Sequence, residues 1–535
     1  MNRILLVTVS ILGLADSLAF GQTTRLANQG KAGLYVKSLD QVLRLTEDEM
    51  DLATAALIAS EYWSDMVHGR RYLEELDAMA LEIHERLRQR HLRVNHHAIP
   101  IINDYLFNEL GYKTISHADD PNDLFLHSVM DRRQGYCLSL SVLYLALAER
   151  LGLKVYGVVV PGHFFVRYES GRIRFNIETT SGGARPPDEH YVTKFNVPQN
   201  GRQTIYMQNL TKRQTLGCFF NNLGNVYHDI GDSETALLAL ERAVAINPTL
   251  SESRANLGNI YLENGRTADA VRQYLAALDL NPNDPKTHNN LGNAYMELTR
   301  LSPAVSSYRQ ALALDPNFVD AYRNLALVYV KLKQYGHALT QLRQAATLAP
   351  RDPAVHSQMG DLYLRMDKYS TAISQFHEAL RLKHDSAEAY YGLALCYHEL
   401  GQTANEIQAY KNTLSLKPDM LPALVNLGNA YFTQANYDSA ISYYGRALEI
   451  RSDDAWIYYN LGSAYSNKGD YPLAVEAYEH AIEVDPEIGD AHHGLAYGLY
   501  MLKQYDRAWK HIQLAKKLGA DVSDEQMRAI AGKAN

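Results

Sequence analysis

The sequence predicts an α+β domain in the N-terminal part of the chain, followed by an all-α superhelical solenoid. Two observations carry this prediction. Between residues 137 and 178, an apolar helical stretch precedes three strand-like segments that are separated by glycine turns. From residue 217, a 34-residue pattern recurs nine times without an insertion.

Composition sets limits on what the chain can be. Its 535 residues are 46% hydrophobic, which is enough to bury cores in at least two domains. The formal charge of −8 comes from interspersed charges of both signs, so no basic area indicates a nucleic-acid partner. The chain has 3 cysteines, too few for a disulfide framework.

The first 21 residues have the pattern of an export signal. Arg3 provides the positive start, residues 4–15 are an apolar run too short to span a bilayer comfortably, and residues 19–21 are a candidate cleavage site. The alternative is an uncleaved N-terminal anchor. We therefore expect an exported protein, periplasmic or extracellular in a bacterium, in which residues 22–44 form a polar lead-in linker.

Residues 45–206 are expected to form the first domain. A helix is predicted from Thr46, with the acidic residues that follow it in the positive first turn. Further amphipathic helices are predicted over residues 71–92 and 98–110, and residues 183–201, which contain three prolines, are predicted to be a loop.

The apolar helix of this domain begins at Cys137, immediately after a Gln-Gly-Tyr turn, and is expected to end near Leu151. At the first turn of a helix, the helix dipole and the free N–H groups favour a thiolate, the reactive form of cysteine. Cys218 and Cys396 lie inside helical patterns and are expected to be small buried hydrophobic residues.

Three strands are expected after this helix, at residues 154–160, 163–168 and 173–178. His163 begins the second strand. Asn176 and Glu178 lie two residues apart on the third, so they share one face. A cysteine, a histidine and a carboxylate or amide in this order suit nucleophilic catalysis, in which the imidazole takes the thiol proton and the third group orients the imidazole.

These residues resemble the transglutaminase-like superfamily, and more narrowly its SirB-type branch, from about residue 45 to about residue 248. The matching text is DPNDLFLHSVMDRRQGYCLSLSVLYLALAERLGLKVYGVVVPGHFFVRY, followed by IETTSGG. The resemblance implies a papain-like thiol fold with Cys137, His163 and an acidic third member. That member aligns with Glu178, although the family usually has Asp there, and Asn176 is the alternative.

The sequence predicts neither a cofactor nor a metal site. His96 and His97 are adjacent, so their side chains point to different sides of a helix, and no third ligand has suitable spacing.

Residues 207–522 contain the nine repeats. Each repeat has a leucine-like position followed by a small residue and, three residues later, usually tyrosine. The leucine-like positions are Leu223, Leu257, Leu291, Leu325, Met359, Leu393, Leu427, Leu461 and Leu495. This pattern resembles the tetratricopeptide repeat, in which small residues allow two helices to cross closely and stacked pairs build a concave face. In the sixth repeat Glu406 and Thr413 replace two alanines, which could loosen its packing, and residues 523–535 are expected to form a capping helix.

Asparagines recur beside the leucine position. Those chosen as candidates for a partner-binding groove are Asn222, Asn225, Asn256, Asn259, Asn290, Asn293, Asn324, Asn426, Asn429 and Asn460. An inward amide ladder would bind the backbone of a protein or peptide partner independently of its side chains. The alternative is that asparagine near a helix start belongs to the common repeat sequence.

Two functions follow from these features. In the first, Cys137 attacks an amide or other acyl carbon, and water or an amine then releases the acyl group, so that the protein is a hydrolase or an acyltransferase whose repeats recruit a protein. In the second, the protein is a non-catalytic scaffold for complex assembly.

Overall fold

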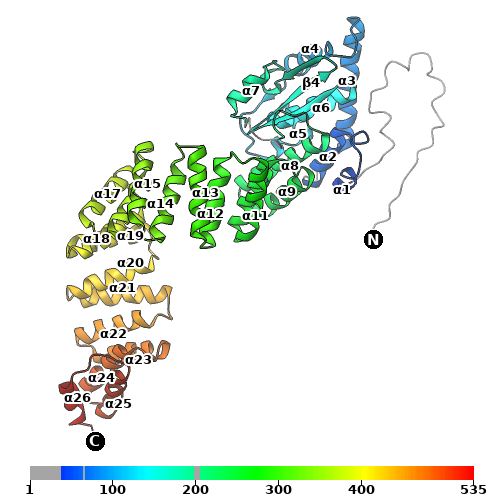
Figure 1. The fold of residues 1–535 in the computed structure, drawn as a ribbon. Coiled ribbons are helices and arrows are strands. Elements are labelled where there is room, and N and C mark those ends of the chain that lie inside the picture. The colour runs from blue at the N-terminus through cyan, green and yellow to red at the C-terminus, as the bar shows by residue number, and fades with distance from the viewer. Residues whose placement is uncertain (1–37, 64–66, 198–204, 535) are drawn as a thin grey trace. The chain divides into compact units, whose positions relative to one another are not determined.

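The computed structural model describes residues 38–63, 67–197 and 205–534. It contains two compact units, residues 1–316 and residues 317–535, and each is described by itself. The predicted export signal at residues 1–21 lies outside the described residues. Figure 1 colours the first unit from blue to green and the second from green to red.

The first unit begins with a series of helices that ends with α6, the helix that starts at Cys137. They are α1 (Leu39–Val42), α2 (Leu52–Trp63), α3 (Gly69–Gln89), α4 (Ala98–Asn103), the π-helix η1 (Asp104–Glu109), the 3₁₀-helix η2 (Pro121–Asp123), α5 (Leu126–Arg132) and α6 (Cys137–Arg150). Two short parallel strands, β1 (Lys113–Thr114) and β2 (Gln134–Gly135), pair just before α6. Gly152 has φ +70°, which is the left-handed conformation expected where α6 ends.

An antiparallel sheet of order β3-β4-β5 follows α6. Its strands are β3 (Val155–Val160), β4 (His163–Ser170) and β5 (Ile173–Ile177), so each predicted strand is present within two residues of its expected bounds. The register pairs Val160 with His163 and Val166 with Ile177. Helix α6 packs against β3 and β4 on one side and contacts α2 and α3, which makes it the buried centre of the domain.

The first repeat shares this hydrophobic core. Phe219 and Phe220 of α8 (Lys212–Asp229) are buried in it, and Phe220 contacts Trp63 of α2 at a ring-centroid distance of 5.3 Å. The connecting segment is held to the sheet, since the N–H of Leu210 donates to the carbonyl of Gly157 at 2.8 Å. Helix α8 is therefore fixed against the α+β domain.

Three local expectations differ from the structure. The helix predicted from Thr46 begins at Leu52, because Thr46 instead bonds Glu49 in a separate turn, through its N–H and hydroxyl, each at 2.9 Å. The predicted lead-in linker contains α1, whose apolar residues pack into the core. The predicted loop at residues 183–201 contains a helix, α7 (Asp188–Lys194).

The repeats form helix pairs throughout the described residues that follow. In the first unit these are α8 with α9 (Ser233–Ile246), α10 (Ser251–Glu263) with α11 (Thr267–Leu280), and α12 (Pro285–Glu297) with α13 (Leu301–Leu314). In the second unit they are α14 (Val319–Lys331) with α15 (Tyr335–Leu348), α16 (Pro353–Arg365) with α17 (Tyr369–Leu382), α18 (Ala387–Glu399) with α19 (Thr403–Leu416), α20 (Leu421–Thr433) with α21 (Tyr437–Ile450), α22 (Ala455–Lys468) with α23 (Tyr471–Val484), and α24 (Gly489–Met501) with α25 (Tyr505–Lys517); α26 (Asp524–Ala531) follows.

Small residues allow the two helices of a pair to cross closely, as expected. The aromatic ring that packs on each small residue belongs to the second helix of the pair, not to the recurring tyrosine of the first helix. A Cβ on Gly292 would lie 2.5 Å from Cε1 of Tyr308, and one on Gly428 equally close to Tyr444. In the sixth repeat Glu406 is 4% exposed and bonds Nδ1 of His398 at 3.0 Å, while the hydroxyl of Thr413 donates to a backbone carbonyl. Both substitutions are thus accommodated by hydrogen bonds.

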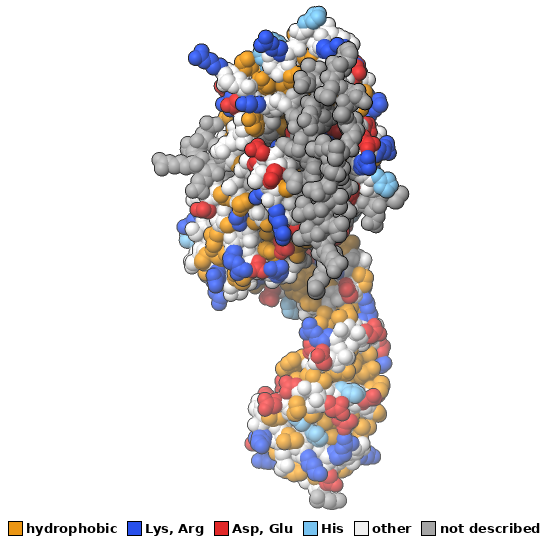
Figure 2. All heavy atoms as spheres, turned by 90° about the vertical axis from the view of Figure 1, so that its right-hand side faces the viewer, with side chains coloured by type: hydrophobic (Ala, Val, Ile, Leu, Met, Phe, Trp, Pro, Cys, Tyr) orange, Lys and Arg blue, Asp and Glu red, His pale blue; other side chains and the backbone are white. Residues whose placement is uncertain are grey.

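The predicted fold class is confirmed: a small α+β region precedes a long, all-helical solenoid. On the face shown in Figure 2, acidic and basic side chains are interspersed among apolar ones, as the composition indicates. Among the described residues, no helix is both long and apolar enough to cross a bilayer.

Candidate functional site

Cys137 lies where the sequence predicts it, at the first residue of α6, and is 4% exposed. The turn before it is fixed by Ser139, whose hydroxyl accepts from the N–H of Tyr136 at 2.9 Å and donates to the carbonyl of Asp123 at 2.8 Å. As the first residue of a helix, Cys137 has an N–H without an intrahelical partner. The thiol is therefore held beside the positive end of a buried helix.

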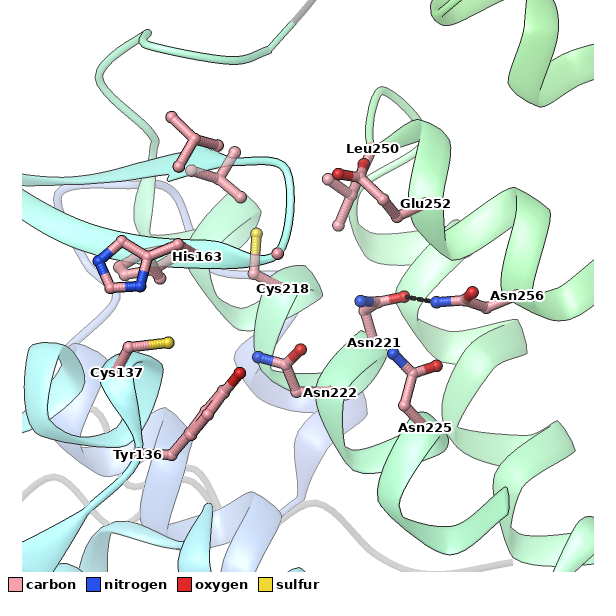
Figure 3. A pocket seen from close by; sticks show the side chains of 14 residues that line it. Tyr136, Cys137, His163, Cys218, Asn221, Asn222, Asn225, Leu250, Glu252 and Asn256 are labelled. Carbon is pink, nitrogen blue, oxygen red and sulfur yellow. Dashed lines mark hydrogen bonds between the residues drawn. The ribbon is translucent and has the colours of Figure 1, made fainter. Parts of the chain in front are cut away.

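His163 begins β4 and its ring lies over the Cys137 side chain (Figure 3). Its Nε2 is 2.8 Å from Oε2 of Glu178, which leaves Nδ1 as the ring nitrogen for the thiol. Burial lowers the pKa of His163, but the hydrogen bonds and charges of Cys137 and Glu178 outweigh burial and raise this pKa to about 9. The environment therefore favours the imidazolium form of His163.

Glu178 is the third member of this arrangement. The chain turns directly after β5, where the N–H of Glu178 donates to the carbonyl of Ala184 at 2.8 Å and η3 (Thr179–Ser181) begins. Its Oε1 accepts from both the N–H and the hydroxyl of Thr180, at 3.1 and 2.5 Å. Burial raises the pKa of Glu178, yet the bonds to His163 and Thr180 bring this pKa below its usual value. The carboxylate is thus held ionised toward the imidazole.

Asn176, the alternative third member, does not contact His163. It pairs with Arg167 across the sheet, accepting from the guanidinium Nε at 2.8 Å, and its amide donates to Oδ1 of Asp188 at 2.7 Å. Both Asn176 and Arg167 are buried. This side chain belongs to a structural network that anchors α7, and the geometry selects Glu178 over it.

Helix α7 and the residue that follows it contribute two aromatic side chains to the site, neither of them among the residues predicted from the sequence. Tyr191 is fully buried and its hydroxyl donates to Oε2 of Glu178 at 3.0 Å. The ring of Phe195 stacks on His163 with centroids 4.8 Å apart and planes 2° from parallel. A stacked aromatic ring shields the imidazole from water and favours its cationic form.

These residues carried a signal that helix-capping rules could have used. The segment after Pro186-Pro187 begins with Asp188 and Glu189, and prolines before acidic residues are typical of a helix start. Tyr136 was also missed: it is half-buried next to the thiol, and burial together with the Cys137 charge raises its pKa to about 12.

A cavity of about 210 Å³ opens beside the Cys137–His163 pair (Figure 3). One wall belongs to the α+β domain and includes Tyr136. The other belongs to the first two repeats and includes Asn222 and Asn225 of α8. The repeats therefore line the space next to the thiol, an arrangement that the sequence analysis did not foresee.

The asparagines proposed for a groove fall into four groups. The amide oxygens of Asn259, Asn293 and Asn429 each accept from a buried tyrosine hydroxyl of the same repeat at 2.7 Å. Others link neighbouring repeats through their amide N–H groups: Asn256 to Asn221, Asn290 to Asn259, and Asn426 to the Tyr391 hydroxyl. Asn222 and Asn225 line the cavity, while Asn324 and Asn460 are half-buried on α14 and α22. Much of the amide ladder thus serves packing between helices.

Histidines elsewhere do not form a metal centre in the part of the chain that the structure describes. The rings of His96 and His97 lie 4.0 Å apart, but no group of three or more potential ligand side chains gathers there or at any other described position.

Comparisons with known proteins agree with this architecture. A family model described as the transglutaminase-like superfamily matches residues 70–216, and tetratricopeptide repeat models match segments between residues 224 and 522. A UPF0162 protein of Xylella fastidiosa is 29% identical over 161 residues, which are 28% of this chain and 57% of that protein. The chain therefore spans little more than half the length of this curated relative.

Two further similarities are weaker, one because it covers a short segment and the other because the sequence identity and the structural similarity are low. F-box only protein 21 of Mus musculus is 38% identical over 72 residues, 13% of this chain and 11% of that protein. A solved structure of pilF from Pseudomonas aeruginosa is 21% identical, covers 39% of this chain and 95% of its own, and has a TM-score of 0.35. Residues 70–216 of this chain are thus a transglutaminase-like domain, and residues 224–522 are an array of tetratricopeptide repeats.

Proposed function

We propose that the protein is a thiol enzyme that hydrolyses or transfers acyl groups through a thioester on Cys137. The observation that carries the proposal is the 2.8 Å contact between Nε2 of His163 and the buried carboxylate of Glu178, with the thiol at the helix start facing the other side of the ring. A thiolate–imidazolium pair oriented by a third group is the arrangement that acyl transfer by cysteine requires.

The chemistry runs in two steps. The Cys137 thiolate attacks the carbonyl carbon of an amide, the carbon–nitrogen bond breaks, and the imidazolium of His163 gives its proton to the departing amine. Water or a second amine then attacks the thioester, His163 takes the proton of the attacking group, and the carbon–sulfur bond breaks to restore the thiolate–imidazolium pair. The N–H of Cys137 stabilises the oxyanion that forms in each step.

The repeats would recruit a protein or peptide to this site. Tetratricopeptide arrays in general mediate protein–protein interactions through the extended surfaces of their stacked helices. Because many of the candidate asparagines already bond other asparagines or nearby tyrosines, we assign partner contact in the first repeat to Asn222 and Asn225. For the segment that precedes the described residues, the proposed role is export.

The test is the rate at which iodoacetamide alkylates Cys137, measured against pH by mass spectrometry of the peptide that contains it. We expect rapid reaction below neutral pH in the wild type and slow reaction in His163→Ala. Cys218 and Cys396 are internal controls, because burial raises the pKa of both thiols, that of Cys396 to about 12.

A second readout follows the acyl-enzyme. With p-nitrophenyl acetate, the wild type should acetylate Cys137 and release the acetyl group, whereas Cys137→Ser and His163→Ala should not. A thiol that reacts only near the pH of free cysteine, indifferently to His163, together with no acetylation, would overturn the proposal and favour the non-catalytic scaffold.

A further inference from the structure

The cavity beside Cys137 has one wall of unusual chemistry for a repeat array. The turn before α10 and the helix itself contribute Leu250, Glu252 and Asn256, and α8 contributes Asn221, Asn222 and Asn225. In Figure 3 the Glu252 side chain extends from α10 toward the space that the thiol and imidazole face from the opposite side. At about 210 Å³ the cavity is smaller than the sites for drug-sized ligands, which are roughly 300–1,000 Å³, so it suits a side chain or a short chemical group.

This wall is held in place by contacts on both sides. The amide of Asn256 donates to Oδ1 of Asn221 at 3.1 Å, which joins α10 to α8. Helix α8 is tied to the α+β domain at its start, where Nζ of Lys212 donates to Oε1 of Glu149 on α6 at 2.5 Å. A Cβ on Gly157 of β3 would lie 3.0 Å from the Thr215 hydroxyl of α8, so sheet and helix approach closely there. The wall is therefore preorganised relative to the thiol.

Glu252 is the acidic group of this wall. Its Oε2 accepts from the Ser251 hydroxyl at 3.2 Å, and the Tyr206 hydroxyl also donates to it. Burial raises the pKa of Glu252; the groups that act against burial are these two hydroxyls and its own N–H. Within the described residues, no lysine, arginine or histidine forms an ion pair with it; its hydrogen-bond partners are neutral, and the negative charge of Asp284 raises its pKa further. A cation placed beside such a carboxyl favours its ionised form, because the opposite charge compensates for burial.

The amides next to Glu252 complement such a ligand. Asn222 and Asn225 are half-buried, their side chains line the cavity, and among the described residues neither has a side-chain hydrogen-bond partner. A free carboxamide can both donate to a carbonyl and accept from an N–H. The wall thus offers one carboxyl group, which a bound cation would keep ionised, and two amides to whatever lies against the thiol.

We infer that Glu252 selects acyl substrates that carry a positively charged ammonium or guanidinium group close to the carbonyl that Cys137 attacks, with Asn222 and Asn225 holding the adjacent amide groups. This inference rests on the proposed function and names the substrate class of the same site. It makes the first two repeats part of the substrate site as well as a surface for a protein partner.

The test compares three thiol reagents of similar size and different charge. Aminoethyl methanethiosulfonate is cationic, sulfonatoethyl methanethiosulfonate is anionic and methyl methanethiosulfonate is neutral; in each, the thiolate attacks sulfur, a disulfide forms and the sulfinate leaves. The second-order rate at Cys137 is measured for each reagent in the full chain by mass spectrometry of its peptide, at mildly alkaline pH.

We expect the wild type to prefer the cationic over the anionic reagent, and we expect Glu252→Gln to lower this ratio of rates by about tenfold or more, which corresponds to about 1.4 kcal/mol. The matched control is Glu234→Gln, which makes the same replacement at an exposed position of α9 outside the cavity. It should leave the ratio unchanged. An unchanged ratio in Glu252→Gln, or an equal fall in both variants, would overturn the inference.

Failure of the proposed function is separately visible in the same experiment. The neutral reagent reports the state of the thiol alone, and its dependence on pH and on His163→Ala tests the thiolate–imidazolium pair. If the rate with the neutral reagent does not change in His163→Ala, the proposed enzyme function is contradicted. If the ratio of cationic to anionic rates does not change in Glu252→Gln, the proposed substrate selectivity is contradicted.

Discussion

The replacement Glu178→Gln removes one negative charge from the side chain that orients the imidazole and retains its size. In the wild type the pKa of His163 rises from 6.5 to about 9, a difference that corresponds to about 3 kcal/mol in favour of the imidazolium. The hydrogen bonds and charges of Cys137 and Glu178 produce this rise together. If Glu178 supplies about half, its loss costs about 1–2 kcal/mol, roughly a tenfold change in the thiolate–imidazolium population.

The assay is alkylation of Cys137 by iodoacetamide across the pH range. We expect Glu178→Gln to slow the reaction below neutral pH by about tenfold and to move the rise in rate to higher pH. Tyr191→Phe, which removes one hydrogen bond to the same carboxylate, should cause a smaller change of the same sign. Asn176→Ala should leave the pH profile unchanged, because this amide bonds Arg167 and Asp188 instead.

The opposite result would refute the assignment. A normal pH profile in Glu178→Gln, with an altered one in Asn176→Ala, would make the amide the orienting group. Circular dichroism on each variant is the control for folding, since both residues are buried and either change could destabilise the domain.

The remaining predictions concern stability, packing and location. The folded pKa of His163 lies above its ordinary 6.5, so its contribution to the free energy of unfolding is fully present below pH 6.5 and is lost as the pH rises through about 9. The stability difference between wild type and His163→Gln, measured by urea unfolding of the first unit, should therefore shrink as the pH rises from 6.5 to about 9. A difference that stays constant with pH would contradict this link between the pKa of His163 and stability. Gly428→Ala should destabilise its repeat by about 1–3 kcal/mol, since the Cβ meets Tyr444 at 2.5 Å, whereas Gly445→Ala, with nothing within 4 Å, should stabilise it by up to about 1 kcal/mol; thermal unfolding that ranks them otherwise would contradict the packing. Asn429→Ala leaves the buried Tyr444 hydroxyl without its acceptor and should lower the free energy of unfolding by about 1–3 kcal/mol in the same measurement. Unchanged stability would contradict a packing role for Asn429. Deletion of residues 2–21 should retain the protein in the cytoplasm of an expressing bacterium, as cell fractionation would reveal, and unchanged export would refute the signal.

The sequence by itself determined the repeats and the position of Cys137 at the start of a helix. Each repeat depends on contacts between residues close in the chain, so its small and apolar positions recur at a constant period and are visible without coordinates. The start of α6 is local too, because a turn followed by a largely apolar run marks where the helix begins. Both features are encoded within a few tens of residues.

The choice between Glu178 and Asn176 was decided only by the tertiary structure. Alternation along a strand puts both on one face, but the strand ends at Ile177, and the turn that follows directs Glu178 to the imidazole. Asn176 is held by Asp188, whose helix lies in a segment that the prolines predict to be a loop. Such outcomes depend on where a chain leaves a sheet and on which distant group competes for a side chain, and neither is written in local periodicity.

The composition of the cavity also depended on the tertiary structure. Glu252 is 115 positions after Cys137 in the chain and belongs to a repeat whose local pattern concerns only its own helix pair. It reaches the space beside the thiol because the aromatic residues of α8 are buried in the core of the preceding domain. The hydrophobic burial that joins domain and repeats therefore places Glu252 on the opposite wall of the cavity from Cys137. No spacing in the sequence predicts that these two residues line one cavity.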